Sequence, residues 1–125
     1  MARLIAAGPI SGENLAALPV KALGPAIAFY EAVLCFTLVR RDASTAVLKR
    51  DDVTIGLVVD PGHEPKRAGS FAMEADDLDL LHRELEERGG RPGEFGVDEW
   101  GGRSHRTFFL REDENGYCYC FHHPL

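Results

Sequence analysis

The sequence predicts an α+β domain made of two modules with the same order of elements: a strand, a helix and then three strands. Helical periodicity occurs in two short stretches, at about residues 25–34 and 78–88, and a short strand-like run precedes each of them. The remaining segments have the alternation and the turn residues typical of short strands. A chain of 125 residues suits one domain, because a fold of this size buries roughly two-thirds of the unfolded surface.

Composition and charge exclude several classes of protein. A content of 45% hydrophobic and 27% charged residues excludes a disordered chain, a collagen-like repeat and a coiled coil. The 20 acidic residues outnumber the 14 basic ones, and the basic residues are dispersed, so we expect no nucleic-acid partner. Gly8-Pro9 breaks the apolar run 4–10, and no run approaches the roughly 18–20 apolar residues that span a bilayer. We therefore expect no membrane partner.

The cysteines indicate the cellular compartment. Cys35, Cys118 and Cys120 are three in number, so they cannot all pair within one chain. This count is typical of a reducing compartment, and we expect a cytoplasmic protein. A pairing of Cys118 with Cys120, or a bridge between chains, remains open.

The first module is expected at residues 14–59, after an N-terminal arm at residues 1–13. Its helix begins near Pro25, whose missing N–H would be unpaired in a first helical turn in any case. The apolar face of this helix consists of Ile27, Phe29, Tyr30, Val33 and Leu34. Strands are expected at residues 36–41, 46–50 and 53–59, with a tight turn at Asp51-Asp52.

A linker at residues 60–68 separates the modules. It is polar and contains two prolines, so we expect it to lie outside the core, with His63 in solvent.

The second module is expected at residues 69–125. Its helix is capped by Asp76 or Asp77 and ends at Gly89-Gly90, which favour a left-handed stop. Its apolar stripe consists of Leu78, Leu81 and Leu85. Strands are expected at residues 94–97, 105–111 and 117–123, with Asn115-Gly116 as a hairpin signal.

Three segments carry a resemblance to a known family. They are Leu18-Pro19-Val20 with the helix ending at Leu34-Cys35-Phe36, the helix start at residues 75–81, and the segment from Phe108 to Tyr117. In this order they resemble the vicinal oxygen chelate superfamily, which includes glyoxalase I, bleomycin-resistance proteins and extradiol dioxygenases. The resemblance covers residues 14–123. The family usually has Gly where this chain has Cys35 and Asp where it has Ala22, and the third segment lacks the usual Pro.

The resemblance implies an open, cup-shaped sheet around a cleft, in a homodimer. The enzymes of the family hold a divalent cation there by His, Glu or Gln on the first and last strands of each module. The resistance and carrier members bind a small molecule without a metal ion.

The residues at the implied ligand positions are Leu15, Gly56, Ser70 and Cys120. Leu and Gly have no donor atom, and a neutral hydroxyl is a poor ligand for a transition metal. Because a catalytic site needs about three protein ligands, we expect no metal cofactor. The alternative is a Zn, Ni, Mn or Fe site with rearranged ligands, drawn from Cys120, His122, Glu74 and His105. Residues on one face of a strand can converge on one ion, and Cys118, Cys120 and His122 share a face of the last strand.

We therefore expect a metal-free protein that sequesters or carries a small aromatic or amphipathic molecule, and we assign no catalytic residue. The candidate ligand-binding residues are Leu15, Ala17, Gly56, Ser70, Glu74, Trp100, His105, Phe109, Cys118, Cys120 and His122. Trp100 offers either a flat face to a ligand or an anchor for its loop, and Glu74 is either an anion in the cleft or a solvated residue. Whether Phe108 or Phe109 points inward stays open. The alternative functions are a metal-dependent lyase, isomerase or dioxygenase of the same superfamily, and a structural or regulatory module.

The remaining histidines have structural expectations. His82 is expected to pack at the boundary of the core. His123 shares a strand face with Tyr117, Tyr119 and Phe121, and that face is expected to pack on the helices.

Overall fold

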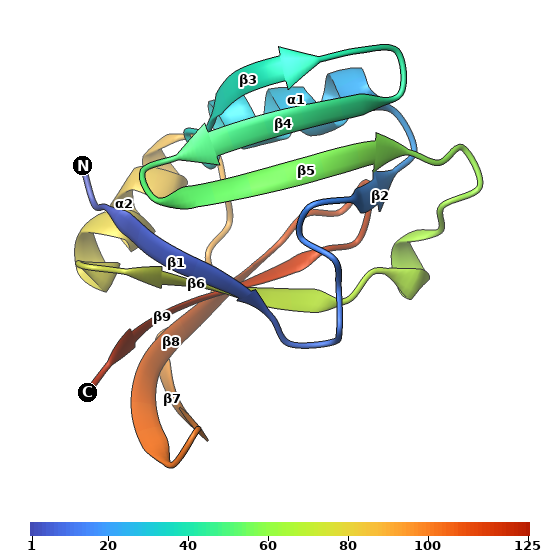
Figure 1. Ribbon diagram of the computed structural model, residues 1–125. Helices are drawn as coiled ribbons and strands as arrows, with labels where there is room; N and C mark the ends of the chain where they lie inside the picture. Colours follow the sequence, from blue (N-terminus) through green and yellow to red (C-terminus); the bar gives the residue numbers. More distant parts are fainter.

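The first module forms a four-stranded sheet with one helix against it. The computed structural model describes all 125 residues. In it, β2 (Leu18–Val20) leads into α1 (Leu23–Ala32), and the chain then forms β3 (Thr37–Arg41), β4 (Thr45–Arg50) and β5 (Val53–Val59). The sheet order is β2-β5-β4-β3, with β2 parallel to β5 and the other pairs antiparallel. Helix α1 packs against β3, β4 and β5 (Figure 1).

The second module repeats this plan. Its elements are β6 (Ser70–Ala75), α2 (Leu78–Glu87), β7 (Gly96–Trp100), β8 (Arg103–Arg111) and β9 (Cys118–Pro124). The sheet order β6-β9-β8-β7 matches that of the first module, and β6 is again parallel to the last strand of its module. The predicted α+β fold of two modules, each with one helix and four strands, is confirmed. The far end of the β7–β8 hairpin curls away from both helices (Figure 1).

An additional strand, β1 (Leu4–Pro9), forms from the segment expected as an N-terminal arm. It pairs antiparallel with β6 and makes the second sheet five-stranded, in the order β1-β6-β9-β8-β7. The sequence gives little local signal for this strand, since Ala, Gly and Pro are depleted in strands. Pro9 is tolerated because β1 lies at the edge of the sheet.

The two helices follow the predicted signals closely. Asp77 is the N-cap of α2, and its carboxylate accepts a hydrogen bond from the N–H of Leu80 at 3.0 Å. Gly89 follows this helix with a φ of 88°, in the left-handed region. Helix α1 begins two residues before the expected Pro25 and ends at Ala32. No helix in the chain is long and apolar enough to cross a bilayer.

The linker differs from the prediction, because His63 is buried and not solvated. Its Nε2 donates a hydrogen bond to the carbonyl of Asn115 at 2.9 Å, and its ring stacks on Tyr117 at 5.8 Å. A short 3-10 helix, Pro65–Arg67, brings the carbonyl of Pro65 against Gly116, where a Cβ would collide with it. A local reading of polarity and prolines cannot reveal these contacts, because they join segments about 50 residues apart.

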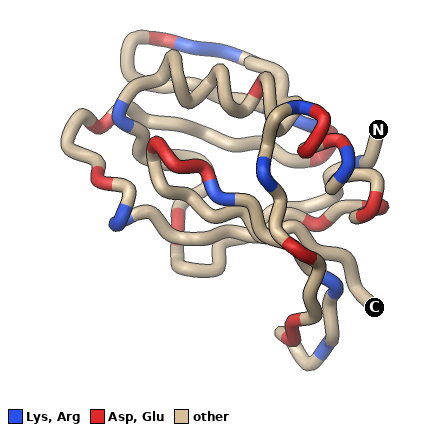
Figure 2. The backbone as a smooth tube through the Cα atoms, turned by 180° about the vertical axis from the view of Figure 1, so that it is seen from behind, with Lys and Arg blue, Asp and Glu red and all other residues tan.

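The core fills the space between sheets and helices with aromatic side chains. Tyr119 and Phe121 of β9 are buried as predicted, and Tyr119 contacts Tyr30 and Phe71 edge-on. His123, expected on the same packed face, is instead exposed near the end of β9, and its Nδ1 donates to the carbonyl of Ala75 at 2.8 Å. Acidic and basic residues are spread over the chain and do not gather into a stripe (Figure 2).

Candidate functional site

A cavity of about 480 Å³ lies on one face of the second sheet, beside β1. Side chains alternate along strands, and the sheet register places Glu74 of β6 opposite His122 of β9 on this face. Small residues leave the space open, since Ala72 and the segment 6–9 form much of the lining. The larger lining residues are Ile10, Glu74, Trp100 and His122. Segment 6–10 was missed as part of the site because its strand was not predicted.

Three rings meet at one end of this cavity. The indole of Trp100 is stacked on the imidazole of His105, with centroids 4.0 Å apart and an interplanar angle of 7°. His122 meets Trp100 edge-on at 4.9 Å. The Nδ1 atoms of His105 and His122 are 3.2 Å apart, and both histidines are buried. Trp100 is 39% exposed, so part of its ring surface faces the cavity and solvent.

Burial disfavours the charged forms of His122 and Cys120 in this site. Burial lowers the pKa of His122 below its ordinary value of 6.5, and the neighbouring His105 lowers it further, while Glu74 acts in the opposite direction. A hydrogen bond between two Nδ1 atoms needs one donor and one acceptor, so the pair carries at most one positive charge while the bond exists. Burial also raises the pKa of the Cys120 thiol to about 11, so Cys120 is a protonated thiol at neutral pH.

Four other predicted site residues lie on the same face of the second sheet without lining the cavity. The register places Phe109 opposite Cys120, and Cys118 opposite Ser70. Phe109 is exposed, whereas Phe108 is buried in the core against Phe121, so Phe109 is the one on the cleft face. The three cysteines are free thiols, and Cys118 does not pair with Cys120.

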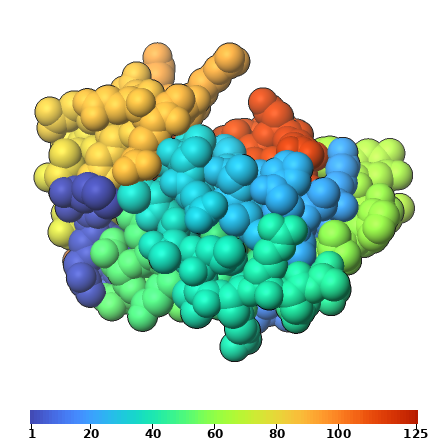
Figure 3. All heavy atoms as spheres, turned by 90° about the horizontal axis from the view of Figure 1, so that it is seen from above, coloured from blue at the N-terminus to red at the C-terminus, as the bar shows by residue number.

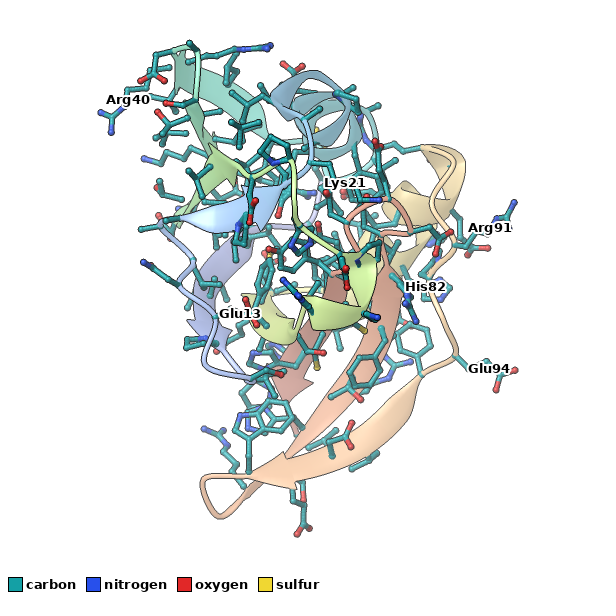
Figure 4. All side chains as sticks on the ribbon, turned by 90° about the vertical axis from the view of Figure 1, so that its right-hand side faces the viewer. Glu13, Lys21, Arg40, His82, Arg91 and Glu94 are labelled. Carbon is teal, nitrogen blue, oxygen red and sulfur yellow. The ribbon has the colours of Figure 1, made fainter.

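The residues predicted on the first module lie in a separate hollow. Leu15 and Gly56 line a space of about 510 Å³ on the first sheet, together with Arg40. Ala7 of β1 lines both spaces, so β1 divides them. Ala17 is exposed and lines neither, and the Arg40 side chain extends outward from the first sheet (Figure 4). Within one chain, the predicted residues therefore form two neighbouring hollows and not a single cleft.

Comparison with known proteins assigns the family. The model of the Glyoxalase/Bleomycin resistance protein/Dioxygenase superfamily matches residues 14–121. The chain belongs to this superfamily. A comparison with curated proteins found no match.

Solved structures of superfamily members share the fold. A bleomycin resistance determinant encoded on the transposon Tn5 is 25% identical, with a TM-score of 0.74 over 90% of this chain and 97% of that one. A bleomycin-binding protein complexed with bleomycin is 24% identical, with a TM-score of 0.73 over 90% and 98% of the two chains. A glyoxalase/bleomycin resistance protein/dioxygenase from Alicyclobacillus acidocaldarius is 21% identical, with a TM-score of 0.70 over 87% and 88%.

The residues at the metal-ligand positions that the resemblance implies offer few donors for a divalent cation. Gly56 is buried beneath the backbone of Ala16, and any Cβ at position 56 would collide with the Ala16 carbonyl. Leu15 has no donor, and Cys120 is a neutral thiol that would have to lose its proton to bind a metal. No three His, Cys, Asp or Glu side chains lie close enough together to hold an ion, which includes the rearranged set of Cys120, His122, Glu74 and His105.

His82 lies away from this cavity, on α2. Its ring packs against Phe95 at 4.8 Å and Phe108 at 5.0 Å, and its Nε2 donates to the carbonyl of Gly93 at 2.9 Å. This is the boundary position that the leucine stripe of α2 predicts. Figure 4 shows His82 beside α2 and Glu94 extending into solvent.

Proposed function

We propose that this protein binds a small aromatic or amphipathic molecule in the cavity on the face of the second sheet beside β1, without a metal ion, and so sequesters or carries it. The observation that carries the proposal is the partly open indole of Trp100 beside Glu74 in an otherwise mostly apolar lining. A cavity with a large apolar surface and a few placed polar groups is the usual form of a small-molecule site.

The lining suggests what the ligand contributes. Stacking on Trp100 favours a flat ring, and the alanines and Ile10 favour apolar surface. Glu74 is the acidic residue of the cavity, and it favours a ligand with a positive charge at the end opposite its apolar part. The bleomycin resistance determinant and the bleomycin-binding protein described above support a ligand-binding role within this superfamily.

The absence of a metal ion is part of the proposal. The donor-poor positions at Leu15 and Gly56 and the neutral thiol of Cys120 support it. Elemental analysis of the purified protein tests it, with less than a tenth of an equivalent of Zn, Ni, Mn and Fe expected. A stoichiometric ion that is lost on Cys120→Ala or His122→Leu would contradict it.

We also propose that the protein works as a homodimer in a reducing compartment such as the cytoplasm. Both hollows open to solvent on either side of β1, and apolar side chains near them are exposed, including Ile5, Ile10 and Trp100. A second copy would cover this surface. The three free thiols are consistent with reducing conditions. Light scattering at micromolar concentration tests the assembly, with twice the 13.8 kDa chain mass expected.

Calorimetric titration with three planar probes of similar size tests ligand binding. The probes are the cation proflavine, neutral 9-anthracenemethanol and the anion 9-anthracenecarboxylate. We expect proflavine to bind best, Trp100→Ala to weaken every probe, and Glu74→Gln to weaken proflavine alone. Glu94→Gln is the matched control, because this exposed carboxylate extends away from the cavity (Figure 4). Absence of binding by all three probes would contradict the proposal.

A further inference from the structure

We propose that the His105–His122 pair is the positioning element of the cavity and holds the Trp100 ring in the orientation that a planar ligand needs. This inference rests on the proposed function, and it assigns to two buried histidines a task other than contact with the ligand or with a metal ion. His105 in particular does not line the cavity.

Trp100 needs such support because of its place in the fold. It is the last residue of β7, the edge strand of the second sheet, which pairs with β8 alone. Gly101 and Gly102 follow it with φ values of 61° and 72°, so the turn beyond it consists of the most mobile residue type. Every residue of β7 is exposed, and its backbone pairing alone does not fix the rotation of the indole.

The two histidines supply that missing constraint from two directions. His105 covers one face of the indole in a nearly parallel stack, and His122 meets its edge at an interplanar angle of 75°. The contact between the two Nδ1 atoms is directional, so it fixes the rotation of both imidazole rings. His105 is 7% exposed, which leaves its ring little room to turn. The opposite face of the indole is left for the cavity.

An ordered Trp100 improves affinity by preorganisation. A ligand that stacks on a freely rotating side chain must order it, and the cost of fixing one such side chain corresponds to about a threefold to tenfold loss in affinity. Breaking the pair should therefore weaken a stacked ligand by about this factor, even where Trp100 and Glu74 remain in place.

The protein itself provides the probe for the test, because Trp100 is its single tryptophan. The variant His122→Leu removes the Nδ1 contact, and His122→Asn keeps an amide near the Nδ1 position. His105→Phe keeps a flat ring against the indole but has no nitrogen. It is the second test variant and replaces His122→Leu if that variant does not fold. His82→Leu is the matched control, since it removes a stacked, hydrogen-bonded histidine on α2.

The ligand-free proteins are compared first, by the anisotropy decay and emission maximum of Trp100 and by circular dichroism. In His122→Leu and His105→Phe we expect faster local motion of the indole and emission at longer wavelength, with unchanged secondary structure. His82→Leu should match the wild type, and His122→Asn should lie between His122→Leu and the wild type, because it keeps a polar contact to His105 and loses the ring against the indole edge. Unchanged Trp100 anisotropy in both His122→Leu and His105→Phe would overturn the inference and leave the proposed function standing.

Proflavine titration then connects the pair to binding. We expect about threefold to tenfold weaker binding in His105→Phe than in the wild type, and wild-type affinity in His82→Leu, which lies outside the cavity. Equal affinity in His105→Phe and the wild type would overturn the role of the pair in binding. Absence of binding by all three probes in the wild type, with Trp100 loosened in the variants, would overturn the proposed function and with it the role of the pair in ligand binding.

Discussion

Cys35 occupies a backbone position that favours glycine. It follows α1 with a φ of 61°, and the N–H of Phe36 closes the helix end by donating to the carbonyl of Tyr30 at 2.9 Å. A left-handed conformation costs a residue with a Cβ about 1–2 kcal/mol of stability. Glycine avoids this strain, but its unfolded chain is more flexible, and this larger entropy loss on folding offsets part of the gain. We therefore expect Cys35→Gly to raise the free energy of unfolding by about 0.5–1 kcal/mol in urea denaturation.

Gly89 provides the comparison for Cys35. It is the second residue after α2 and also has a positive φ, of 88°, and a Cβ there would meet no atom within 4 Å. Gly89→Ala should therefore lower stability through backbone strain alone, by about 1 kcal/mol. A loss of stability on Cys35→Gly would show that contacts of the thiol outweigh the strain.

His122 makes stability depend on pH. The groups that face it are His105 on β8, Glu74 on β6, its neighbour His123, and Trp100 on β7. Because the folded pKa lies below the unfolded value of 6.5, the unfolded chain binds more protons at mildly acid pH. The stabilisation is complete above about pH 6.5 and is lost as the pH falls through the folded pKa.

We expect the difference in unfolding free energy between the wild type and His122→Asn to shrink as the pH is lowered from 7.5 to 5. Thermal or urea unfolding at intervals of half a pH unit measures it. A difference that stays constant over this range would show that His122 does not titrate differently in the folded and unfolded chains.

At the scale of elements, the segment before β2 determines what the first sheet can hold. Residues 14–17 bend over β5, the N–H of Gly56 donates to the carbonyl of Leu15 at 2.8 Å, and the Ala16 backbone occupies the place of a side chain at position 56. Gly56→Ala should displace this segment and lower stability by about 1–3 kcal/mol, the usual cost of overpacking.

Gly24→Ala is the control for Gly56→Ala. A Cβ at position 24 meets nothing within 4 Å and lies in α1, where alanine is the better helix former. This variant should be neutral or slightly stabilising in the same denaturation experiment. Equal stability of Gly56→Ala and the wild type would mean that the segment moves aside easily, and that the first sheet can accept a larger group.

The elements differ in how far the sequence could predict them. Helix α2 was predictable, because its leucine stripe, its Asp77 cap and Gly89 are all local signals. Strand β1 was not, because its stability comes from pairing with β6, about 65 residues away. The same distinction applies to the site. Alternation along β6 and β9 placed Glu74 and His122 on one face, whereas the stack of Trp100 on His105 depends on the curl of a hairpin that no local pattern encodes.

At the scale of the whole molecule, a buried ion pair joins the two modules and the N-terminal segment. Arg50 at the end of β4 lies 3.0 Å from Glu84 on α2, and both are at least nine-tenths buried. Arg50 also donates to the carbonyls of Leu34 and Ala2, each at 2.8 Å, and Glu84 accepts from the N–H of Ala2. The N-terminal residues lie between α2 and the β4–β5 turn (Figure 3). Nothing in the sequence indicates this pairing, since each partner looks like a surface charge on its own element.

The loss of stability on removing one partner distinguishes a buried ion pair that connects the modules from a surface ion pair. Removing one partner leaves the other charged and buried, so Arg50→Met and Glu84→Leu should each lower the unfolding free energy by about 3–5 kcal/mol, a large share of the stability of a small domain. The double variant leaves neither charge of this pair buried, and the groups that lose partners are the backbone of Ala2 and Leu34 and the carboxylate of Asp51. It should therefore lose about 2 kcal/mol less than the sum of the single losses. The exposed pair Arg106–Asp79 at 2.9 Å is the control. A double-mutant cycle on this pair should give a much smaller coupling free energy, because water solvates either partner when the other is removed. Strictly additive losses at positions 50 and 84 would mean that each residue acts through its own backbone contacts and that the charge pair does not hold the modules together.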